Sequence, residues 1–486
     1  MIDKFAEEEI CSGIAKLDSS FYLLQVVTCR TAFSITNQFF TAMSTVSLRS
    51  IDPNERIHVL DSARGFALLG ILLMNIPFFG LPFEAAVALN IRNEYSGPNY
   101  YTWWIVSLLF EGSMRGLFSI MFGASMVLLT TRLSNKAHID SAAEIYYRRM
   151  IWMLLFGLID AFLILWPGDI LYSYALCGLF LFPFRSMKPK YLFLVAAILL
   201  VLFTVKSTWM DKEPLRLKKE AAIIQKLDTT KIKLNDDQKE VMEKWTGFQE
   251  KQKLENKQKE TVKELRKTKG SYATLFSYYA DINFILQTTD FYHNGFLDCI
   301  IFMLIGIAFF KLKILTGERS KQFYLILALL GYVIAFPLAY WKLHMAVSTK
   351  FDIIKMLEQT PFATYEIRRF GLTIGHLGLI MFFYKLGWFR FLFNAWGKVG
   401  QMAFSNYLLQ NITCGILFHG HGFNLFNELQ RYQLYYVVGC VWLVNILFSY
   451  IWLYYFRIGP LEWIWRSLTY WKWQPLRKHT MIEAAL

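Results

Sequence analysis

The chain has 486 residues, of which 55% are hydrophobic, 17% aromatic and only 18% charged, with a formal net charge of +14. Globular proteins carry about 25% charged residues, so this composition favours a polytopic membrane protein over a soluble one. Lys and Arg stand in short clusters between apolar segments, a pattern that indicates membrane topology and argues against a nucleic-acid-binding face. The six cysteines form no CxxC pair, which argues against a disulfide framework or a metal centre.

Residues 1–55 form a leader that differs from the rest of the chain. Its first 42 residues contain acids and a Ser/Thr-rich run, without the basic and long apolar regions of a cleaved signal peptide. Met43 then precedes a short polar segment. We predict that translation normally starts at or near Met43, so that residues 1–42 are not native.

About ten apolar segments follow, and they predict an all-helical membrane bundle. We expect an N-terminal half over 56–209, a C-terminal half over 291–475 and a tail at 476–486. Spans three and four are joined only by Pro167-Gly168, so a helical hairpin and a re-entrant pair both remain open. The expected spans are 60–81, 103–130, 150–166, 169–184, 191–209, 294–314, 322–341, 367–388, 400–418 and 434–456.

The distribution of Lys and Arg over the short loops predicts the orientation. Most of these residues fall on the side that holds both chain ends, which places that side in the cytoplasm. The hydrophilic segment 210–290 is then extracytoplasmic. Its Lys and Glu predict helices with i, i+4 charge pairs such as Glu240 with Lys244. These charges form either a solvated face or a lid over a substrate site.

The opening span carries charge where charge is costly. Asp61 and Arg64 are one helical turn apart and can neutralise each other, while Asn75 returns to the face of Arg64 about 16 Å further along. Gly65 and Gly70 allow another helix to approach closely. The alternatives are a structural ion pair and a ligand pocket.

Two further places hold polar residues inside or beside the spans. Glu111 and Arg115 are spaced i, i+4 in span two, as a neutralised pair or a substrate-binding group. Asp160 and Asp169 place two carboxylates near the expected outer surface. Either can act as a general base, although Asp169 can instead cap the fourth helix.

Spans eight and nine carry the remaining candidates. His376 lies in the middle of span eight, as a hydrogen-bonded structural residue or a base. Asn406 and Gln410 recur on one face of span nine, where interhelical hydrogen bonding explains them as well as substrate contact does. His419 and His421 lack a nearby carboxylate or Cys, so we expect no metal.

Five motifs in order resemble the YeiB-like bacterial membrane proteins, and the likeness covers residues 56 to 475. The resemblance implies a membrane helix bundle. The motifs are Arg56-x3-Leu60-Asp61-x2-Arg64-Gly65 through Asn75, Leu117-Phe118-x3-Phe122-Gly123-Ala124, Gly168-Asp169-Ile170-Leu171-x2-Tyr174-Ala175, Ala403 to Gln410, and Phe456 to Arg466.

The opening motif also resembles that of the heparan-alpha-glucosaminide N-acetyltransferases. This resemblance implies transfer of an acyl group from cytosolic acyl-CoA, acetyl-CoA in those enzymes, to an amino sugar or other glycan acceptor on the far side. Many YeiB-like members carry a His shortly before the Gly-Asp-Ile-Leu motif, where this chain has Asp160. A desolvated carboxylate can serve as the base instead.

Two classes of function follow from these residues. In the enzyme reading, Arg64 and basic loops attract the phosphates of acyl-CoA, Asn75 or Arg115 stabilises an oxyanion, and Asp160, Asp169 or His376 deprotonates the acceptor. In the transport or binding reading, the same residues form a polar pathway for a small solute or ion, without covalent chemistry.

Overall fold

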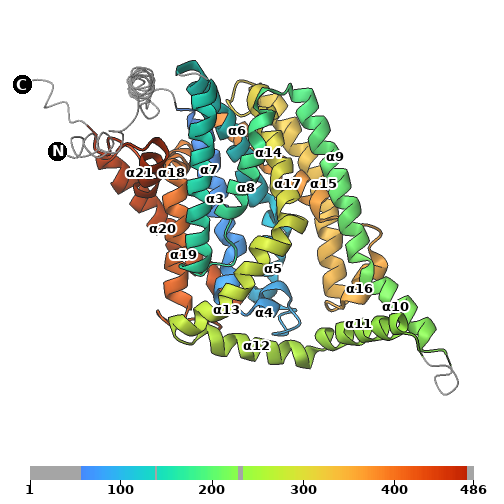
Figure 1. Ribbon diagram of the computed structural model, residues 1–486. Coiled ribbons are helices and arrows are strands. Elements are labelled where there is room, and N and C mark those ends of the chain that lie inside the picture. The colour runs from blue at the N-terminus through green and yellow to red at the C-terminus, as the bar shows by residue number, and fades with distance from the viewer. Residues whose placement is uncertain (1–55, 137–138, 228–233, 479–486) are drawn as a thin grey trace, which may run out of the picture.

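The computed structural model describes residues 56–136, 139–227 and 234–478, and the expected start at Met43 lies outside these ranges. Within them the chain is a bundle of helices (Figure 1), and the only extended pairing is an isolated bridge between Phe456 and Arg477. The expected all-helical fold is confirmed.

The first half of the bundle opens with a long apolar helix that ends just after an internal proline, Pro77. Two breaks interrupt the helices that follow, one at Glu111–Gly112 and one over residues 163–170. The helices are α3 (His58–Gly80), α4 (Phe83–Val87), α5 (Gly97–Phe110), α6 (Ser113–Lys136), α7 (Ile139–Phe162), α8 (Leu171–Leu181), the 3₁₀ turn η2 (Phe182–Ser186) and α9 (Pro189–Asp211).

Hydrophilic helices then connect to the second half. We call α10–α12 the strap; its middle helix starts with a capping box between Asn235 and Gln238. The elements are α10 (Glu213–Ile224), α11 (Asp236–Gln252), α12 (Leu254–Thr268), α13 (Tyr272–Ile285), the π-helix η3 (Leu286–Gly295), α14 (Phe296–Lys311), α15 (Lys321–Ser348), α16 (Ile353–Gln359), α17 (Tyr365–Leu386), α18 (Arg390–Gln401), α19 (Ala403–Phe418), α20 (Arg431–Tyr455) and α21 (Pro460–Tyr470).

Six helical segments of the described chain are long and apolar enough to cross a membrane. Only 17% of the apolar window in Pro189–Ile224 is buried inside the protein, so a wide apolar face points outward, as lipid requires. The other expected spans fall on α7, α8, α17 and α19, which are too short or too charged to qualify by composition. The six are His58–Gly80, Gly97–Ser134, Pro189–Ile224, Tyr272–Lys311, Lys321–Ser348 and Arg431–Tyr455.

Spans three and four form an unequal pair. α7 has 24 residues, whereas α8 has 11 and is about 16 Å long, too short to cross a hydrocarbon core of about 30 Å. Residues 163–170 connect them, and their Leu165 and Trp166 are buried. The first residue of α8 therefore lies inside the bundle, and the pair is closer to a re-entrant element than to a full hairpin.

Glycines set the closest helix crossings. A Cβ on Gly331 of α15 would lie 2.4 Å from the backbone N of Gly375 on α17, and one on Gly306 of α14 would lie 2.1 Å from the carbonyl O of Ile120 on α6. Contacts this short leave no room for a side chain, so small residues bring these backbones together as in other membrane bundles.

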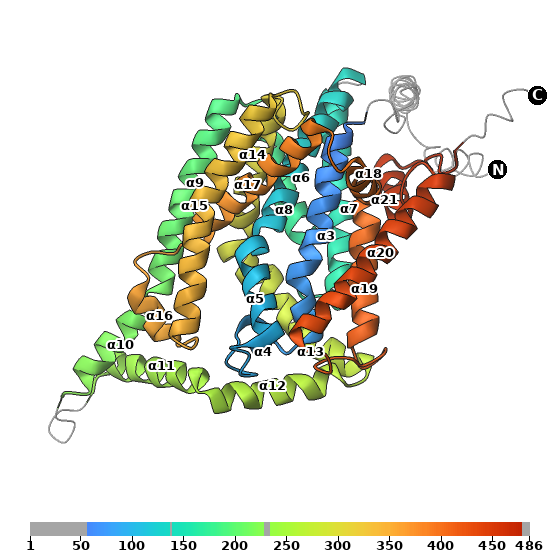
Figure 2. The same cartoon turned by 180° about the vertical axis from the view of Figure 1, so that it is seen from behind.

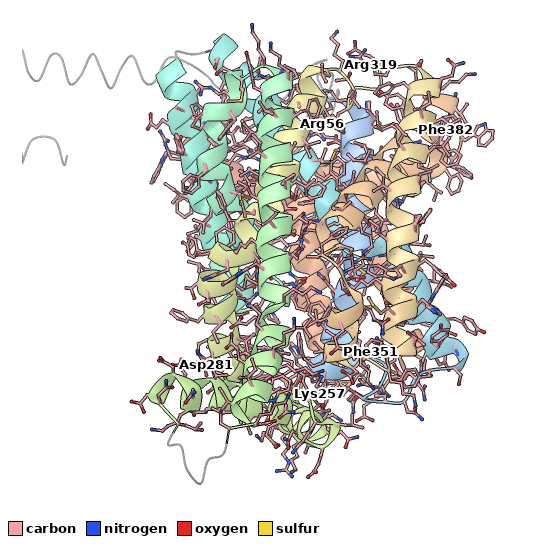
Figure 3. All side chains as sticks on the ribbon, turned by 90° about the vertical axis from the view of Figure 1, so that its right-hand side faces the viewer. Arg56, Lys257, Asp281, Arg319, Phe351 and Phe382 are labelled. Atoms are coloured by element: carbon pink, nitrogen blue, oxygen red, sulfur yellow. The ribbon has the colours of Figure 1, made fainter. Side chains whose placement is uncertain are left out.

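The two ends of the bundle differ. The start of α3 and the helix α21 lie at one end, and the strap crosses the other (Figures 1 and 2). Figure 3 shows Arg56 and Arg319 towards the first end and Lys257 and Asp281 at the opposite one. The strap is fastened by Glu264, which accepts from the backbone N of Phe83 at 3.0 Å, and by an ion pair between Lys257 and Glu84.

Candidate functional site

Arg64 joins three helices near the start of α3. Its Nη1 lies 2.9 Å from Asp61 Oδ1, as the sequence predicts, and its Nη2 donates to Ser125 Oγ of α6 at 2.7 Å. Nη1 also approaches the carbonyl O of Gly400 on α18. Asp61 is in the first turn of α3, where an acid interacts favourably with the helix dipole.

The crossing of α3 and α18 holds this arginine in place. A Cβ on Gly400 would lie 1.9 Å from the carbonyl O of Asp61, and one on Gly65 would lie 1.9 Å from the carbonyl O of Trp396. The expected close approach at Gly65 is therefore confirmed, and Gly70 faces the side chain of Met114 on α6. Backbone contact on this scale fixes Asp61 and Arg64 relative to α18.

A cavity of about 250 Å³ opens beside Arg64. On α6 its lining runs from Phe118 to Arg132, which corresponds to about 21 Å of helix. Between these two residues the α6 wall is mostly apolar, with Phe122 and Met126 facing the space. The cavity is thus a narrow channel with an apolar side.

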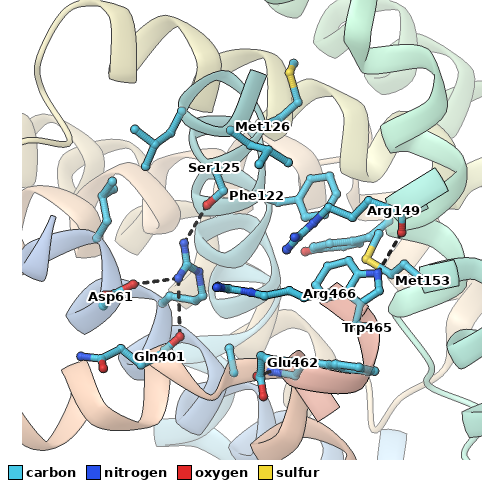
Figure 4. Close-up of a pocket in the computed structure, with 18 of the residues that line it drawn as sticks. Asp61, Phe122, Ser125, Met126, Arg149, Met153, Gln401, Glu462, Trp465 and Arg466 are labelled. Atoms are coloured by element: carbon cyan, nitrogen blue, oxygen red, sulfur yellow. Dashed lines mark hydrogen bonds and ion pairs between the residues drawn. The ribbon is translucent and has the colours of Figure 1, made fainter. Parts of the chain in front are cut away.

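Arginines dominate the charge of this cavity. Arg149 of α7 stacks 3.7 Å above the Trp465 ring, and Arg466 of α21 extends into the same space (Figure 4). Among the described residues neither Arg149 nor Arg466 forms an ion pair. Arg56 also has no carboxylate partner there and donates to the neutral Gln401 Oε1 at 2.6 Å. The lining arginines are Arg56, Arg64, Arg132, Arg149 and Arg466.

In the part of the lining that the structure describes, two carboxylates are present, and both have partners. Asp61 pairs with Arg64, and Glu462 accepts from the backbone N of Phe404 at 2.8 Å and of Ser405 at 3.1 Å. Glu462 is thereby committed to the start of α19. Even without Arg132, four half-buried arginines face these two carboxylates in the described lining, which favours an anionic ligand.

Tyr407 lies at the inner end of the cavity with Ile170, Leu171 and Tyr174. Its hydroxyl accepts from the backbone N of Ile170 at 3.2 Å and lies near Asp160. The ring is almost completely buried. Tyr407 therefore connects the cavity to the carboxylates behind it.

Asp160 and Asp169 lie close to each other behind Tyr407. The fully buried Asp160 accepts from Asn411 Nδ2 at 2.8 and 3.1 Å. Asp169 accepts from the backbone N of Leu171 and Tyr172 at 3.0 and 2.8 Å, so it caps α8, one of its two expected roles. The two acids lie inside the bundle rather than at its surface.

Comparison with known proteins identifies the family. The uncharacterized protein YeiB of Escherichia coli K12 is 30% identical over 427 residues, which cover 85% of this chain and 96% of that protein. The chain belongs to the YeiB-like family. The uncharacterized protein YxaH of Bacillus subtilis 168 is 29% identical over 443 residues, covering 90% of this chain and all of YxaH. The family model described as a protein of unknown function, DUF418, matches residues 309–472. No solved structure matches.

A second charged group of this YeiB-like protein lies at the break between α5 and α6, and the expected pair of Glu111 with Arg115 is not formed. Gly112 has a φ of +75°, which ends α5 and turns Glu111 away from α6. Glu111 bonds instead to Lys342 and Arg368, both at 3.0 Å, and Arg115 to Asp298 at 2.9 Å. The i, i+4 rule fails here because the helix is interrupted between the two residues.

The other candidate residues lie away from the cavity. His376 is bonded at both ring nitrogens, to the Tyr332 hydroxyl at 2.9 Å and to the carbonyl O of Leu109 at 2.8 Å. Asn406 donates to Ser449 Oγ of α20, an interhelical bond of the kind expected for the polar face of α19. Gln410 is buried on that face, and Asn75 is only partly buried on α3.

Sequence reasoning missed several residues of both charged groups. Tyr407 and Arg466 stood in the family motifs without a role, because nothing in one sequence shows that their segments meet. Asp298 and Arg369 could have been found, since ionisable residues within or at the edge of a span are functional candidates by default. Arg149 lies one residue before the predicted start of span three. It was therefore counted among the loop Lys and Arg residues that predict the orientation.

Proposed function

We propose that this protein is an acyl-CoA-dependent transmembrane acyltransferase of the bacterial inner membrane. The observation that supports it is the arginine-lined cavity, whose inner end is Tyr407 backed by Asp160 and Asp169. A phosphate-bearing donor would enter from the cytoplasmic side, and the acyl group would pass to an acceptor, such as a glycan, that approaches from the opposite face.

The lining residues fit the donor in two parts. Guanidinium groups such as those of Arg149 and Arg466 bind phosphate oxygens in bidentate fashion. The apolar wall of α6 suits the acyl-pantetheine arm rather than the charged nucleotide. The nucleotide would therefore remain at the mouth, near Arg56 and Arg132.

The inner end of the cavity suits the transfer step. The acceptor O–H or N–H would lose its proton to Asp160 through the Tyr407 hydroxyl while the acceptor atom attacks the thioester carbonyl. The C–S bond breaks, a C–O or C–N bond forms, and the proton is returned to the coenzyme A thiolate. Asp169 acts as a positioning residue, because it caps α8 and holds the loop beside Asp160.

Transport without covalent chemistry is the second candidate. It is favoured by the half-length helix α8 and the interruption between α5 and α6, because broken helices near the middle of the membrane form solute sites in transporters. The two functions differ in a measurable product: an acyltransferase leaves labelled acyl groups on an acceptor, and a transporter does not.

Donor binding is the first test. Purified full-length protein with Arg149→Gln and Arg466→Gln should bind acetyl-CoA at least about tenfold more weakly than the parent, because charge-assisted hydrogen bonds are lost. Arg266→Gln on the exposed strap is the matched control and should bind normally. Equal binding in both variants would reject the cavity as the donor site.

Transfer is tested separately in membrane vesicles supplied with acetyl-labelled coenzyme A. The parent should place label on a membrane or glycan product, and Asp160→Asn should bind the donor but transfer nothing. Uptake of an unmodified solute that depends on Asp160, with no labelled product, would favour transport instead.

A further inference from the structure

The second charged group, at the break between α5 and α6, holds arginines near the N-termini of two helices. Positive charge is unfavourable at a helix N-terminus. Arg115 is the third residue of α6, and Arg368 and Arg369 are the fourth and fifth of α17. The first turn of a helix carries partial positive charge and favours anions. Gly112 and Arg369 are in contact, so the two helix starts lie side by side.

The carboxylates that contact these cations are mostly shared between two of them. Asp298 pairs with both Arg115 and Arg369, and Glu111 pairs with both Arg368 and Lys342. The remaining acid of this group, Glu366, lies 3.7 Å from Arg369. Four cations thus meet three carboxylates among these residues, and two of the carboxylates are shared.

Several guanidinium N–H groups of this cluster are buried without an acceptor. They are Nε and Nη2 of Arg368, Nε of Arg369 and Nε of Arg115, and the side chains of Arg368 and Arg369 are 0% exposed. A buried donor without an acceptor costs about 1–3 kcal/mol, and native proteins rarely leave such groups unsatisfied. Arginines with this many open donors are suited to an added oxyanion.

We propose that the cluster of Arg115, Arg368 and Arg369 is a binding site for a phosphate group. Access is from the side of Arg115 and Lys342, whose side chains are 42% and 34% exposed. The site is separate from the cavity, and Tyr174 stands between them: it lines the cavity and its hydroxyl donates to the carbonyl O of Arg115. The proposal does not depend on acyl transfer.

The oxyanion can come from a lipid headgroup or from a small solute, and two probes distinguish these sources. Inorganic phosphate is titrated at constant ionic strength against the thermal unfolding of purified full-length protein. Retention of phosphatidylglycerol, compared with phosphatidylcholine, is measured by native mass spectrometry after release from nanodiscs. Both are done with Arg149→Gln and Arg466→Gln present, which removes the cavity arginines as competing sites.

In that background, Arg368→Gln and Arg115→Gln should each weaken binding of the responding probe by about tenfold or more. Arg115→Lys keeps the charge but loses the planar fork, so it should recover only part of the affinity. Arg266→Gln should change nothing. Loss of phosphate binding identifies a small anion, and loss of phosphatidylglycerol retention alone identifies a headgroup.

Arg115→Gln keeps the test valid if the buried Arg368→Gln fails to fold, because the Arg115 side chain is partly exposed. If neither probe binds the background protein, or if folded Arg115→Gln binds both probes as well as the background protein does, the site does not exist. Those results leave acetyl-CoA binding by the parent untouched, so failure here and failure of the acyltransferase proposal are distinguishable.

Discussion

The cavity and the strap are both rich in charge, but their charges are arranged in opposite ways. Most ion pairs of the strap are local, at i, i+3 or i, i+4, and their partners are exposed, as in Lys244 with Glu240 at 2.5 Å. The exceptions join the strap to other helices, as Lys257 does with Glu84. In the cavity, leaving Arg132 aside, four arginines face two carboxylates of the described lining, and both carboxylates already have partners.

This difference separates charge that solvates a helix from charge that forms a site. Exposed pairs contribute little to stability, because water screens them and long side chains lose entropy when they pair. Half-buried arginines without a carboxylate partner persist only where other contacts hold them, as Arg149 is held by stacking on the Trp465 ring. An excess of one sign inside the bundle therefore indicates function more strongly than a high density of charge outside it.

The largest expected difference between the two regions is the side of the membrane on which each of them lies. In a cysteine-free background, Lys253→Cys on the strap should react with an impermeant thiol reagent in intact cells, and Lys321→Cys at the opposite end should not. The contrast should be all or none, and Lys321→Cys should react once the cells are opened. Reaction of Lys321→Cys alone in intact cells would reverse the orientation.

The crossing that positions the cavity should be the most sensitive to added volume. Gly400→Val places a side chain on the carbonyl O of Asp61 and should destabilise the protein by about 1–3 kcal/mol or more, measured as a lower thermal unfolding temperature in detergent. Gly439→Val on α20 is the matched control, since nothing lies within 4 Å of its Cβ. Equal destabilisation by the two substitutions would mean that α3 and α18 are not tightly packed where they cross.

The ion pair of Asp61 with Arg64 on α3 can serve ligand binding or only helix packing, and variants distinguish the two. Asp61→Asn together with Arg64→Gln removes both charges, so the double variant should reach the membrane at normal levels while each single variant is reduced by an unpaired charge. If Arg64 contacts the donor, the double variant should bind acetyl-CoA about tenfold more weakly. Arg64→Lys should be intermediate. Normal binding in the double variant would leave the pair as packing.

The sequence predicted the helical bundle well, because long apolar segments have few alternatives in a membrane. It also predicted the pair of Asp61 with Arg64, since their contact is local. It could not predict that Asp160 would meet Asp169 behind Tyr407, because that contact depends on the path of residues 163–170. The assumed pair of Glu111 with Arg115 was wrong for the same reason: local spacing holds only while the helix continues through Gly112.

The smallest expected effect is on the strap, at Glu264, an acid that does not form a local surface pair. Glu264 is four residues after Glu260 and would repel it, but Glu260 pairs with Lys263, and Glu264 turns to the backbone N of Phe83. Burial there raises the pKa of Glu264 to about 7 from an ordinary value of 4.5.

The raised pKa makes the docking of α12 depend on pH. Between about pH 4.5 and 7 the folded protein keeps a proton that the unfolded chain has released, so this contribution to stability falls as the pH rises and is lost above 7. Amide exchange in α12, corrected for its intrinsic rate, should therefore be faster at pH 8 than at pH 5.5. Glu264→Gln should remove that difference, whereas Glu240→Gln, an exposed acid of the same strap, should keep it. An unchanged pH dependence in Glu264→Gln would mean that another titratable group controls the docking of the strap.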